Sequence, residues 1–301
     1  MIEIVKAPPF ATVQDLGFPS GRAWGMPQGG AMDPEWLGLA NRLAGAGPGA
    51  AAIEWASGPG AIRVRRTVRL AVVGLAELRL DGQLLTPPAL GFTASAGSTV
   101  SITPGMHHRF SYLAIEGGIA VPQVLGSRST YLPGGLGGHE GRRLQAGDQL
   151  PIGRDTVGAP PGVEVNPLQR YAALGDLDIR VTRGPQWDRF DERARAGFFA
   201  GRFTVARASD RMGYRLDGPT IRPTETAALP SEAACLGAIQ IPDGGQPIVL
   251  MPDGPTVGGY PKLAVVVRAD LRRLAQCTAE RGIRFREVSL DEARACYSLT
   301  P

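Results

Sequence analysis

Short runs in which apolar and polar residues alternate recur along most of the chain, and this pattern predicts β-strands rather than long helices. Residues 77–80 and 83–85 flank an Asp-Gly pair at 81–82, which favours the positive φ angles of a tight type I′ turn. A second hairpin is predicted from residues 239–241 and 247–251, which flank the Gly-Gly turn at 244–245. Further strands are predicted at residues 68–73, 99–103 and 109–115.

Helical patterns are few and short. Asp33 can cap a helix that begins with proline, so we predict a helix over residues 34–43. Two more are predicted over residues 188–199 and 269–275. A capping-box pattern at 289–292 predicts the start of a short C-terminal helix.

Composition adds turns to this picture and divides the chain. The 301 residues include 41 glycines and 26 prolines, which indicates many turns and short strands. Residues 151–167 lose the apolar alternation and are rich in proline and glycine, so we place a domain boundary there. We therefore predict two β-rich domains, over residues 1–155 and 168–301, each a barrel or a sandwich.

Charge and cysteine usage exclude several protein classes. The net charge is +4, and the arginines are scattered, which is typical of a solvated surface and not of a nucleic-acid interface. Cys235, Cys277 and Cys296 are odd in number and widely spaced, as in a reducing compartment. The sequence has no apolar run long enough for a signal peptide or a membrane span. We therefore expect a soluble, cytoplasmic protein.

Lysine is nearly absent from the chain. Lys6 and Lys262 are the only lysines among 32 basic residues, and Lys262 lies in the turn-rich run 253–262. An ammonium is a compact point charge whose pKa responds to burial, whereas a guanidinium is planar and stays charged. Lys262 is thus a candidate for a site that needs an ammonium. The alternative is that a lysine occurs at this position by chance.

The same two lysines limit which cofactors this chain can bind alone. Neither lysine follows a glycine, as a phosphate-binding P-loop requires, and neither stands in the setting of a biotin acceptor. If ATP or biotin takes part in the reaction, we expect another chain to supply most of the binding machinery.

Several other segments place polar residues among glycines. Residues 134–141 are either an anion cradle or an ordinary loop, and residues 125–130 form a candidate oxyanion cluster. Residues 14–33, which include Arg22, suit a ligand loop or an ordinary helix cap. Residues 210–215 predict a structural ion-pair network. Packing or turn roles, and no metal, are predicted for His107, His108 and His139.

Six segments, taken together and in order, resemble one family: the KipA family, also called allophanate hydrolase subunit 2 or the C-type subunit of 5-oxoprolinase. The resemblance covers residues 5–285. The segments are residues 12–17 (TVQDLG), 30–34 (GAMDP), 125–131 (LGSRSTY), 210–216 (DRMGYRL), 237–242 (GAIQIP) and 256–262 (TVGGYPK).

The resemblance implies a mainly β fold of two cyclophilin-like β-barrel domains with a few short helices. It implies a KipI-type partner (the B-type subunit of 5-oxoprolinase) and a third protein (the A-type subunit), which together form an ATP-dependent 5-oxoprolinase. The same pair of folds forms the carboxyltransferase part of urea carboxylase. No nucleic-acid or membrane partner is expected.

We therefore expect a subunit of ATP-dependent 5-oxoprolinase, which converts 5-oxoproline to glutamate. The lactam is very stable, so ATP is needed to activate its amide oxygen. Lys262, Arg22 and Arg128 are candidates for holding anionic oxygens, and Asp253 for orienting Lys262 or handling a proton. Tyr260 completes the expected catalytic set. The remaining candidates for substrate binding are Gln14, Asp15, Ser127, Gln240, Thr256, Gly258 and Gly259.

The geometry expected for Lys262 is a rigid turn. Gly258 and Gly259 allow tight backbone geometry, and Pro261 stiffens the approach, so the ammonium is predicted to project from this turn. Two other functions stay open: a biotin-dependent carboxyltransferase acting on urea or a similar amide, and a non-enzymatic regulator that binds a KipI-type protein.

Overall fold

The strands divide between two units. Unit 1 comprises Met1–Ser20 and Gly29–Ala172, and unit 2 comprises Gly21–Gln28 and Ala173–Pro301. Of the predicted boundary, residues 155 and 159–167 lie outside the described residues, as do His107 and His108. The computed structural model describes residues 1–74, 76–85, 90–105, 109–154, 156–158, 175–224, 229–279 and 281–298.

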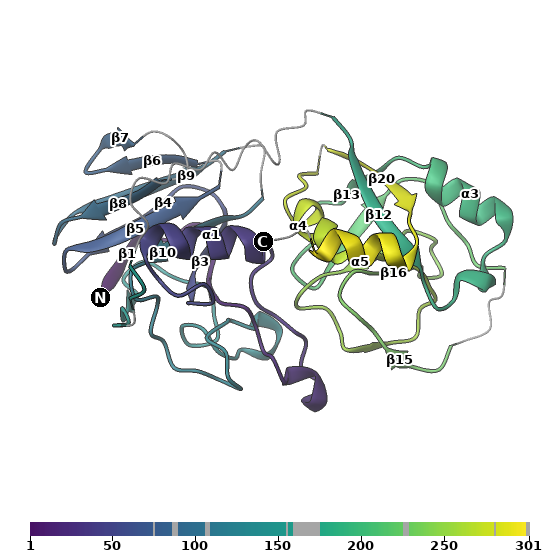
Figure 1. Cartoon of the computed structure of the whole chain (residues 1–301), viewed down its shortest axis with the longest axis horizontal. Coiled ribbons are helices and arrows are strands. Elements are labelled where there is room, and N and C mark those ends of the chain that lie inside the picture. The colour runs from purple at the N-terminus through teal and green to yellow at the C-terminus, as the bar shows by residue number, and fades with distance from the viewer. Residues whose placement is uncertain are drawn as a thin grey trace. The chain divides into compact units, whose positions relative to one another are not determined.

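Unit 1 is built from two antiparallel sheets (Figure 1). The six-stranded sheet has the order β11 (Gln149–Leu150), β1 (Ile2–Lys6), β4 (Gly60–Val64), β9 (Thr99–Pro104), β6 (Ala76–Leu80) and β7 (Gln83–Leu85). The five-stranded sheet has the order β2 (Phe10–Gln14), β3 (Ala52–Ser57), β10 (Ser111–Ile115), β5 (Val68–Val73) and β8 (Leu90–Ala94). The predicted Asp-Gly hairpin is confirmed: Asp81 and Gly82 have φ angles of 49° and 84° between β6 and β7.

The strand alternation supplies the core of unit 1. Inward side chains from both sheets form one cluster, in which Ile53 and Leu113 of one sheet meet Ile62 and Val100 of the other. Burying a side chain of this size stabilises the fold by roughly 1.5–3 kcal/mol. The short η2 turn (Leu132–Gly134) lies outside the sheets.

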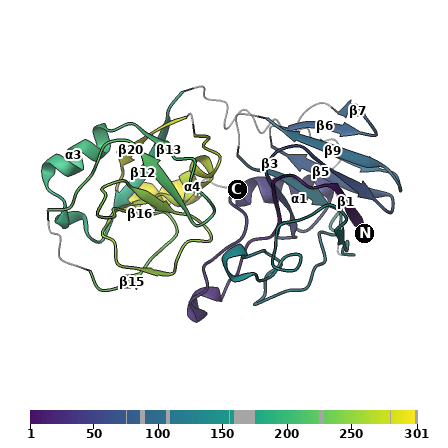
Figure 2. The same cartoon turned by 180° about the vertical axis from the view of Figure 1, so that it is seen from behind.

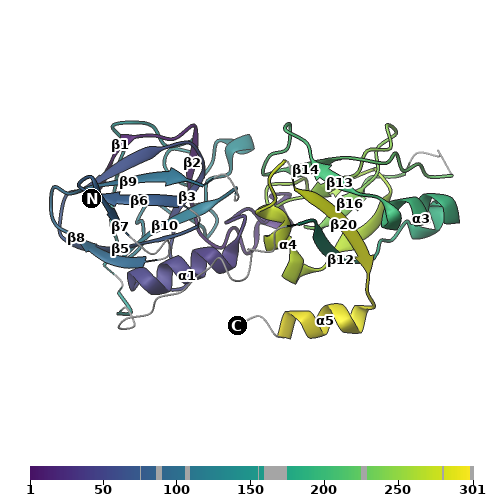
Figure 3. The same ribbon diagram turned by 90° about the horizontal axis from the view of Figure 1, so that it is seen from above.

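Helix α1 (Pro34–Ala44) packs on the five-stranded sheet, against β5 and β10 (Figure 3). The predicted start is confirmed, because the Asp33 carboxylate accepts the Trp36 N–H at 3.1 Å. The helix ends at Gly45, whose φ of 79° is a left-handed conformation that glycine adopts without strain.

In unit 2 the strands close a barrel. The order is β12 (Leu177–Arg183), β19 (Lys262–Val266), β16 (Ala238–Gln240), β17 (Ile248–Leu250), β14 (Gly213–Asp217), β13 (Phe203–Val205) and β20 (Gly282–Glu287). Strands β12 and β20 are parallel, and the other barrel pairs are antiparallel. The predicted mainly β fold is confirmed, and so is the second hairpin, β16–β17.

One predicted helix of unit 2 is divided in two. Residues 188–199 were expected to be a single helix, but the 3-10 turn η3 (Trp187–Arg189) ends before α3 (Glu192–Ala200) begins. The Asp191 carboxylate accepts the Ala194 N–H at 2.8 Å and so starts a new helix. Helix α3 packs on β20, where the rings of Phe198 and Phe285 stack with centroids 4.7 Å apart.

Unit 2 also has a small ribbon outside its barrel. Strands β15 (Glu232–Ala233) and β18 (Val257–Gly258) pair as a two-stranded antiparallel sheet, and Figure 2 shows β15 outside the barrel strands. The remaining elements are η1 (Gly21–Trp24), α4 (Arg268–Ala275) and α5 (Leu290–Ser298). Among the described residues, no helix has both the length and the apolar character needed to cross a membrane.

A buried ion pair fastens α4 to β12. The Asp270 carboxylate is fully buried and accepts hydrogen bonds from the Arg180 side chain at 2.7 and 2.9 Å. It also accepts the Arg180 backbone N–H at 2.8 Å. Burial alone would raise the pKa of Asp270, but these hydrogen bonds and the charges of Arg180 and Arg273 outweigh it and lower the pKa.

Asp270→Asn should therefore destabilise unit 2 in a pH-dependent way. At pH 7 we expect a loss of about 3 kcal/mol in the free energy of unfolding, because one partner of a buried pair is removed. The pKa of Asp270 is lower in the folded protein than its ordinary value of 3.8 in the unfolded chain, so its ionised carboxylate stabilises the fold above pH 3.8. This contribution is lost as the pH falls through the lower pKa of the folded protein. The difference between the two proteins should thus shrink below about pH 4. Urea unfolding followed by tryptophan fluorescence measures it.

The exposed pair of Asp291 with Arg294 offers a control, since Asp291→Asn should change the free energy of unfolding by less than about 1 kcal/mol. An equal effect of the two substitutions would contradict a stabilising role for the buried pair.

Candidate functional site

Lys262 is the first residue of barrel strand β19 and is only 2% exposed. This corrects the expectation that its ammonium projects from a turn, because β19 is paired on both sides, with β12 and β16. The Lys262 Nζ donates to Glu232 Oε1 at 2.5 Å. Glu232 lies on the β15–β18 ribbon, directly opposite Gly258. The ribbon therefore brings a carboxylate to an ammonium on the barrel.

Gln186 ties this ion pair to the backbone of the barrel. Its amide nitrogen donates to Glu232 Oε1 at 2.7 Å, and its amide oxygen accepts the backbone N–H of Lys262 at 3.0 Å. The hydrogen bond from Lys262 is the main cause that lowers the pKa of Glu232, against a smaller opposing effect of burial. The carboxylate is thus kept ionised, and the 41% exposure of its side chain favours the same charged form.

Gln240 adds a second donor on the barrel wall. It is paired in register with Lys262 across β16 and β19, next to an irregularity between Ile239 and Gln240. Directly paired residues of antiparallel strands point to the same face of a sheet. The buried Gln240 amide nitrogen has no hydrogen-bond partner among the described residues. A Cβ at Gly258 would lie only 2.7 Å from it, so a side chain at 258 would crowd this amide.

Asp253 contacts a different partner from the one predicted. Its carboxylate is buried, and its two oxygens accept from Arg211 Nε at 2.8 Å and Nη2 at 2.9 Å. The expectation that Asp253 orients Lys262 is therefore corrected: the carboxylate at Lys262 is Glu232. Asp210, expected in the ion-pair network, instead accepts the backbone N–H groups of Met212 and Gly213.

The other predicted residues of unit 2 lie around the ribbon. Arg22 donates to the backbone oxygen of Ala234, and Thr256 Oγ1 donates to the backbone oxygen of Gly25 at 3.1 Å. These bonds fasten residues 21–28 to the ribbon. Tyr260 is 46% exposed. A Cβ at Gly259 would lie 3.2 Å from the backbone oxygen of Leu229.

In unit 1, Asp15 is the centre of a hydrogen-bonded loop cluster. Its Oδ1 accepts the Ser127 and Ser129 hydroxyls, each at 2.6 Å, and the Gly17 N–H at 2.8 Å. Its Oδ2 accepts the Arg128 N–H at 2.6 Å. These contacts of Asp15 and Ser127 are structural: they fold the 125–131 segment onto the end of β2.

Gln14 and the glycine run extend the same cluster. The Gln14 amide nitrogen donates to Thr12 Oγ1 at 3.0 Å and to the Thr130 backbone oxygen at 3.1 Å. Gly137 and Gly138 have positive φ angles, and a Cβ at either would lie within about 2 Å of Ser129 O or Thr130 Oγ1. Close packing thus explains these two glycines of the 134–141 run.

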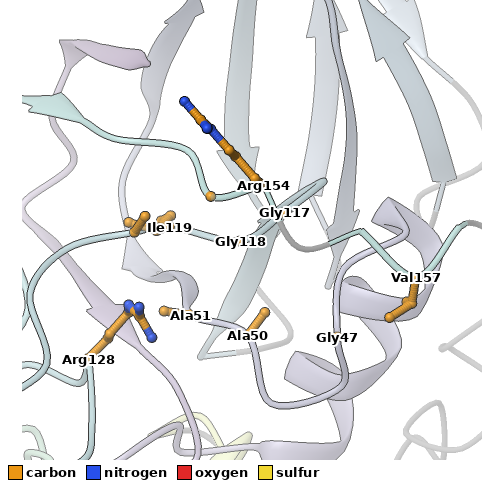
Figure 4. A pocket seen from close by; sticks show the side chains of 11 residues that line it. Gly47, Ala50, Ala51, Gly117, Gly118, Ile119, Arg128, Arg154 and Val157 are labelled. Atoms are coloured by element: carbon orange, nitrogen blue, oxygen red, sulfur yellow. The ribbon is translucent and has the colours of Figure 1, made fainter.

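Arg128 lines a cavity of about 460 Å³ in unit 1 (Figure 4). Its Nε donates to the Val121 backbone oxygen at 2.9 Å. In Figure 4 the Arg128 side chain points toward Ala51. Arg154 also lines the cavity but extends away from Ala51. The full lining is Gly47, Ala50, Ala51, Gly117, Gly118, Ile119, Ala120, Arg128, Gly153, Arg154 and Val157. Arg128 therefore contributes a positive charge to this cavity, which suits an anion.

Metal-binding chemistry has no support in the described part of the chain, where no three His, Cys, Asp or Glu side chains gather around a common point. His139 Nε2 lies 3.4 Å from Asp148 Oδ1. Cys235, Cys277 and Cys296 are not joined in disulfides.

Sequence reasoning missed Glu232 and Gln186, which lie outside the six family-like segments. One signal for Glu232 was available. A lysine that becomes buried in the fold needs a nearby carboxylate. Glu232 is one of the few acidic residues in the 231–262 stretch that contains Lys262, so it was a candidate partner.

Comparison with known proteins identifies relatives along most of the chain. A family model for the carboxyltransferase domain, subdomain A and B, matches residues 24–287. The chain is 37% identical to the C-type 5-oxoprolinase subunit of Escherichia coli (strain K12), over 97% of this chain and 93% of that protein.

Two fungal proteins contain a similar region within much longer chains. The urea amidolyase of Saccharomyces cerevisiae is 33% identical over 90% of this chain and 16% of that protein. The crystal structure of the Kluyveromyces lactis urea amidolyase matches with a TM-score of 0.85 and 29% identity, over 97% of this chain and 19% of that chain.

The Asp15 cluster yields a stability prediction for unit 1. Asp15→Ala removes the acceptor of four hydrogen bonds from buried or half-buried donors, so the free energy of unfolding should fall by about 3 kcal/mol. Asp15→Asn keeps one acceptor oxygen and should cost less. Urea unfolding measures both. Glu77→Gln, in an exposed pair with Arg79, is the control and should cost less than about 1 kcal/mol; full stability of Asp15→Ala would contradict the role given to Asp15.

Proposed function

The chain belongs to the family of carboxyltransferase domains with subdomains A and B, and we propose that it acts as the C-type subunit of an ATP-dependent 5-oxoprolinase. The observation that carries this proposal is the 37% identity to a C-type 5-oxoprolinase subunit over nearly the full length of both chains. The match to urea amidolyase is weaker and covers a small part of that protein.

In this proposal the chain works with a KipI-type partner, the B-type subunit, and with an A-type subunit. The complex opens the lactam of 5-oxoproline to glutamate and hydrolyses ATP. The sequence offers no P-loop lysine for ATP, because neither lysine follows a glycine. We therefore assign ATP binding mainly to the partner subunits.

The residues of this chain would bind and orient a small polar anion. The Lys262 ammonium would hold an anionic oxygen, and the Gln240 amide would donate a second hydrogen bond. Arg128 would hold an anionic group at the unit 1 cavity. Asp253 would act indirectly, since Arg211 occupies its carboxylate. We also assign the chain to a reducing compartment, the cytoplasm, because its three cysteines are odd in number and widely spaced in the sequence.

A second function is favoured by the family description. Carboxyl transfer to urea or a similar amide would use the same anion-binding groups and would need biotin on another protein. Lys262 would then stabilise a carboxylate or enolate-like oxygen.

Reconstitution separates the two functions. The chain alone should release no ADP, with or without 5-oxoproline, and the three-protein mixture should release ADP when 5-oxoproline is added. Urea with a biotinylated carrier and a biotin carboxylase is the parallel assay. Turnover by the isolated chain, or turnover only in the urea assay, would overturn the oxoprolinase proposal.

Lys262 is the residue whose replacement tests the chemistry. Lys262→Ala should leave the chain folded, because the Glu232 carboxylate it abandons is 41% exposed and can be hydrated. Turnover of the complex should fall about a hundredfold if a preorganised charge contact is lost. Lys262→Arg should also be impaired, because a larger planar head does not fit a site that is 2% exposed.

The control is Lys6→Arg, which should turn over normally. Wild-type turnover of the Lys262→Arg variant would mean that the reaction does not need an ammonium at this position.

A further inference from the structure

The two partners of the Lys262–Glu232 pair differ sharply in burial. Lys262 is 2% exposed and begins a strand that is paired on both sides. The Glu232 side chain is 41% exposed and comes from a ribbon of two-residue strands that is separate from the barrel sheet. Moving the ammonium would disrupt the barrel wall, whereas moving the carboxylate returns it to water at small cost.

The barrel face at this point offers hydrogen-bond donors. The Lys262 ammonium and the Gln240 amide nitrogen come from adjacent strands, and the acceptor that meets the ammonium is Glu232 of the ribbon. The Gln240 nitrogen, buried and without a partner among the described residues, lies against Gly258, the residue paired with Glu232. A buried donor left without an acceptor is unfavourable, and a ligand with a second acceptor oxygen would satisfy it.

We propose that Lys262 and Gln240 form an oxyanion subsite and that Glu232 is its exchangeable internal occupant. A small carboxylate displaces the Glu232 carboxylate from the ammonium and accepts a further hydrogen bond from Gln240. The Gln186 amide nitrogen, which donates to Glu232 Oε1, is released by the same displacement and becomes available to the ligand. The choice of 5-oxoproline as that carboxylate rests on the proposed function, whereas the subsite itself rests on the contacts at Lys262.

Glu232 thereby sets the affinity of the site. The apparent affinity for a ligand equals the intrinsic affinity multiplied by the fraction of molecules in which the ammonium is free. If the internal carboxylate occupies the ammonium nine-tenths of the time, its removal tightens binding about tenfold. A carboxylate with a merely structural role would leave ligand affinity unchanged or would weaken it.

Titration calorimetry on the full chain tests this directly, with 5-oxoproline, acetate and inorganic phosphate as separate probes. Glu232→Gln and Glu232→Ala should bind 5-oxoproline and acetate about tenfold more tightly than the natural chain. Adding Lys262→Met to Glu232→Gln should abolish the gain. Glu287→Gln removes the same charge from an exposed pair with Arg183 in the same unit, and its affinities should be unchanged. Circular dichroism confirms that each variant is folded.

The outcomes separate this inference from the proposed function. Tighter binding of acetate and phosphate without a gain for 5-oxoproline would support the subsite and count against 5-oxoproline as its ligand. Unchanged affinity for every probe in both Glu232 variants would overturn the inference, even if the reconstituted complex hydrolyses 5-oxoproline. In that complex, Glu232→Gln should lower the KM for 5-oxoproline more than it changes kcat.

Discussion

A buried ammonium requires a counter-charge, and the candidate site of unit 2 is organised around this requirement. Lys262 cannot reach water, so a carboxylate has to be delivered to it. The β15–β18 ribbon delivers that carboxylate, and Gln186 links it to the backbone of the strand that carries the lysine. The fold thus places a buried positive charge on the barrel and a partly exposed negative charge on the ribbon.

Unit 1 contains a buried negative charge where unit 2 contains a buried positive one. There the buried charge is the carboxylate of Asp15, which is surrounded by hydroxyl and backbone donors that cannot leave without unfolding the loop. The cation of that loop, Arg128, is directed instead to a cavity lined by small residues. The segments that resemble family motifs therefore contain residues with different roles. Asp15 and Ser127 stabilise the loop, whereas Arg128 lines the cavity.

Local chemistry made the fold predictable in part. The Asp-Gly pair at 81–82 and the cap at Asp33 act within a few residues, so sequence alone predicts their hairpin and helix. Partner choice between distant residues is not local. Asp253 is close in sequence to Lys262, yet it pairs with Arg211, because the barrel brings β14 and β17 together. Glu232 was missed for the same reason: its partner is set by a ribbon whose strands are two residues long.

The register irregularity between Ile239 and Gln240 has a consequence for how this scaffold can diverge. Since side chains alternate between the two faces of a strand, a shift of β16 by one residue would place the apolar side chain of Ile239 or Ile241, instead of the Gln240 amide, opposite Lys262. Length changes in the barrel strands would thus erase the polar face in a single step. The connections of the ribbon do not set the register between β16 and β19. Relatives with different ligands are therefore expected to differ in the length of these connections and to keep the same strand register in the barrel.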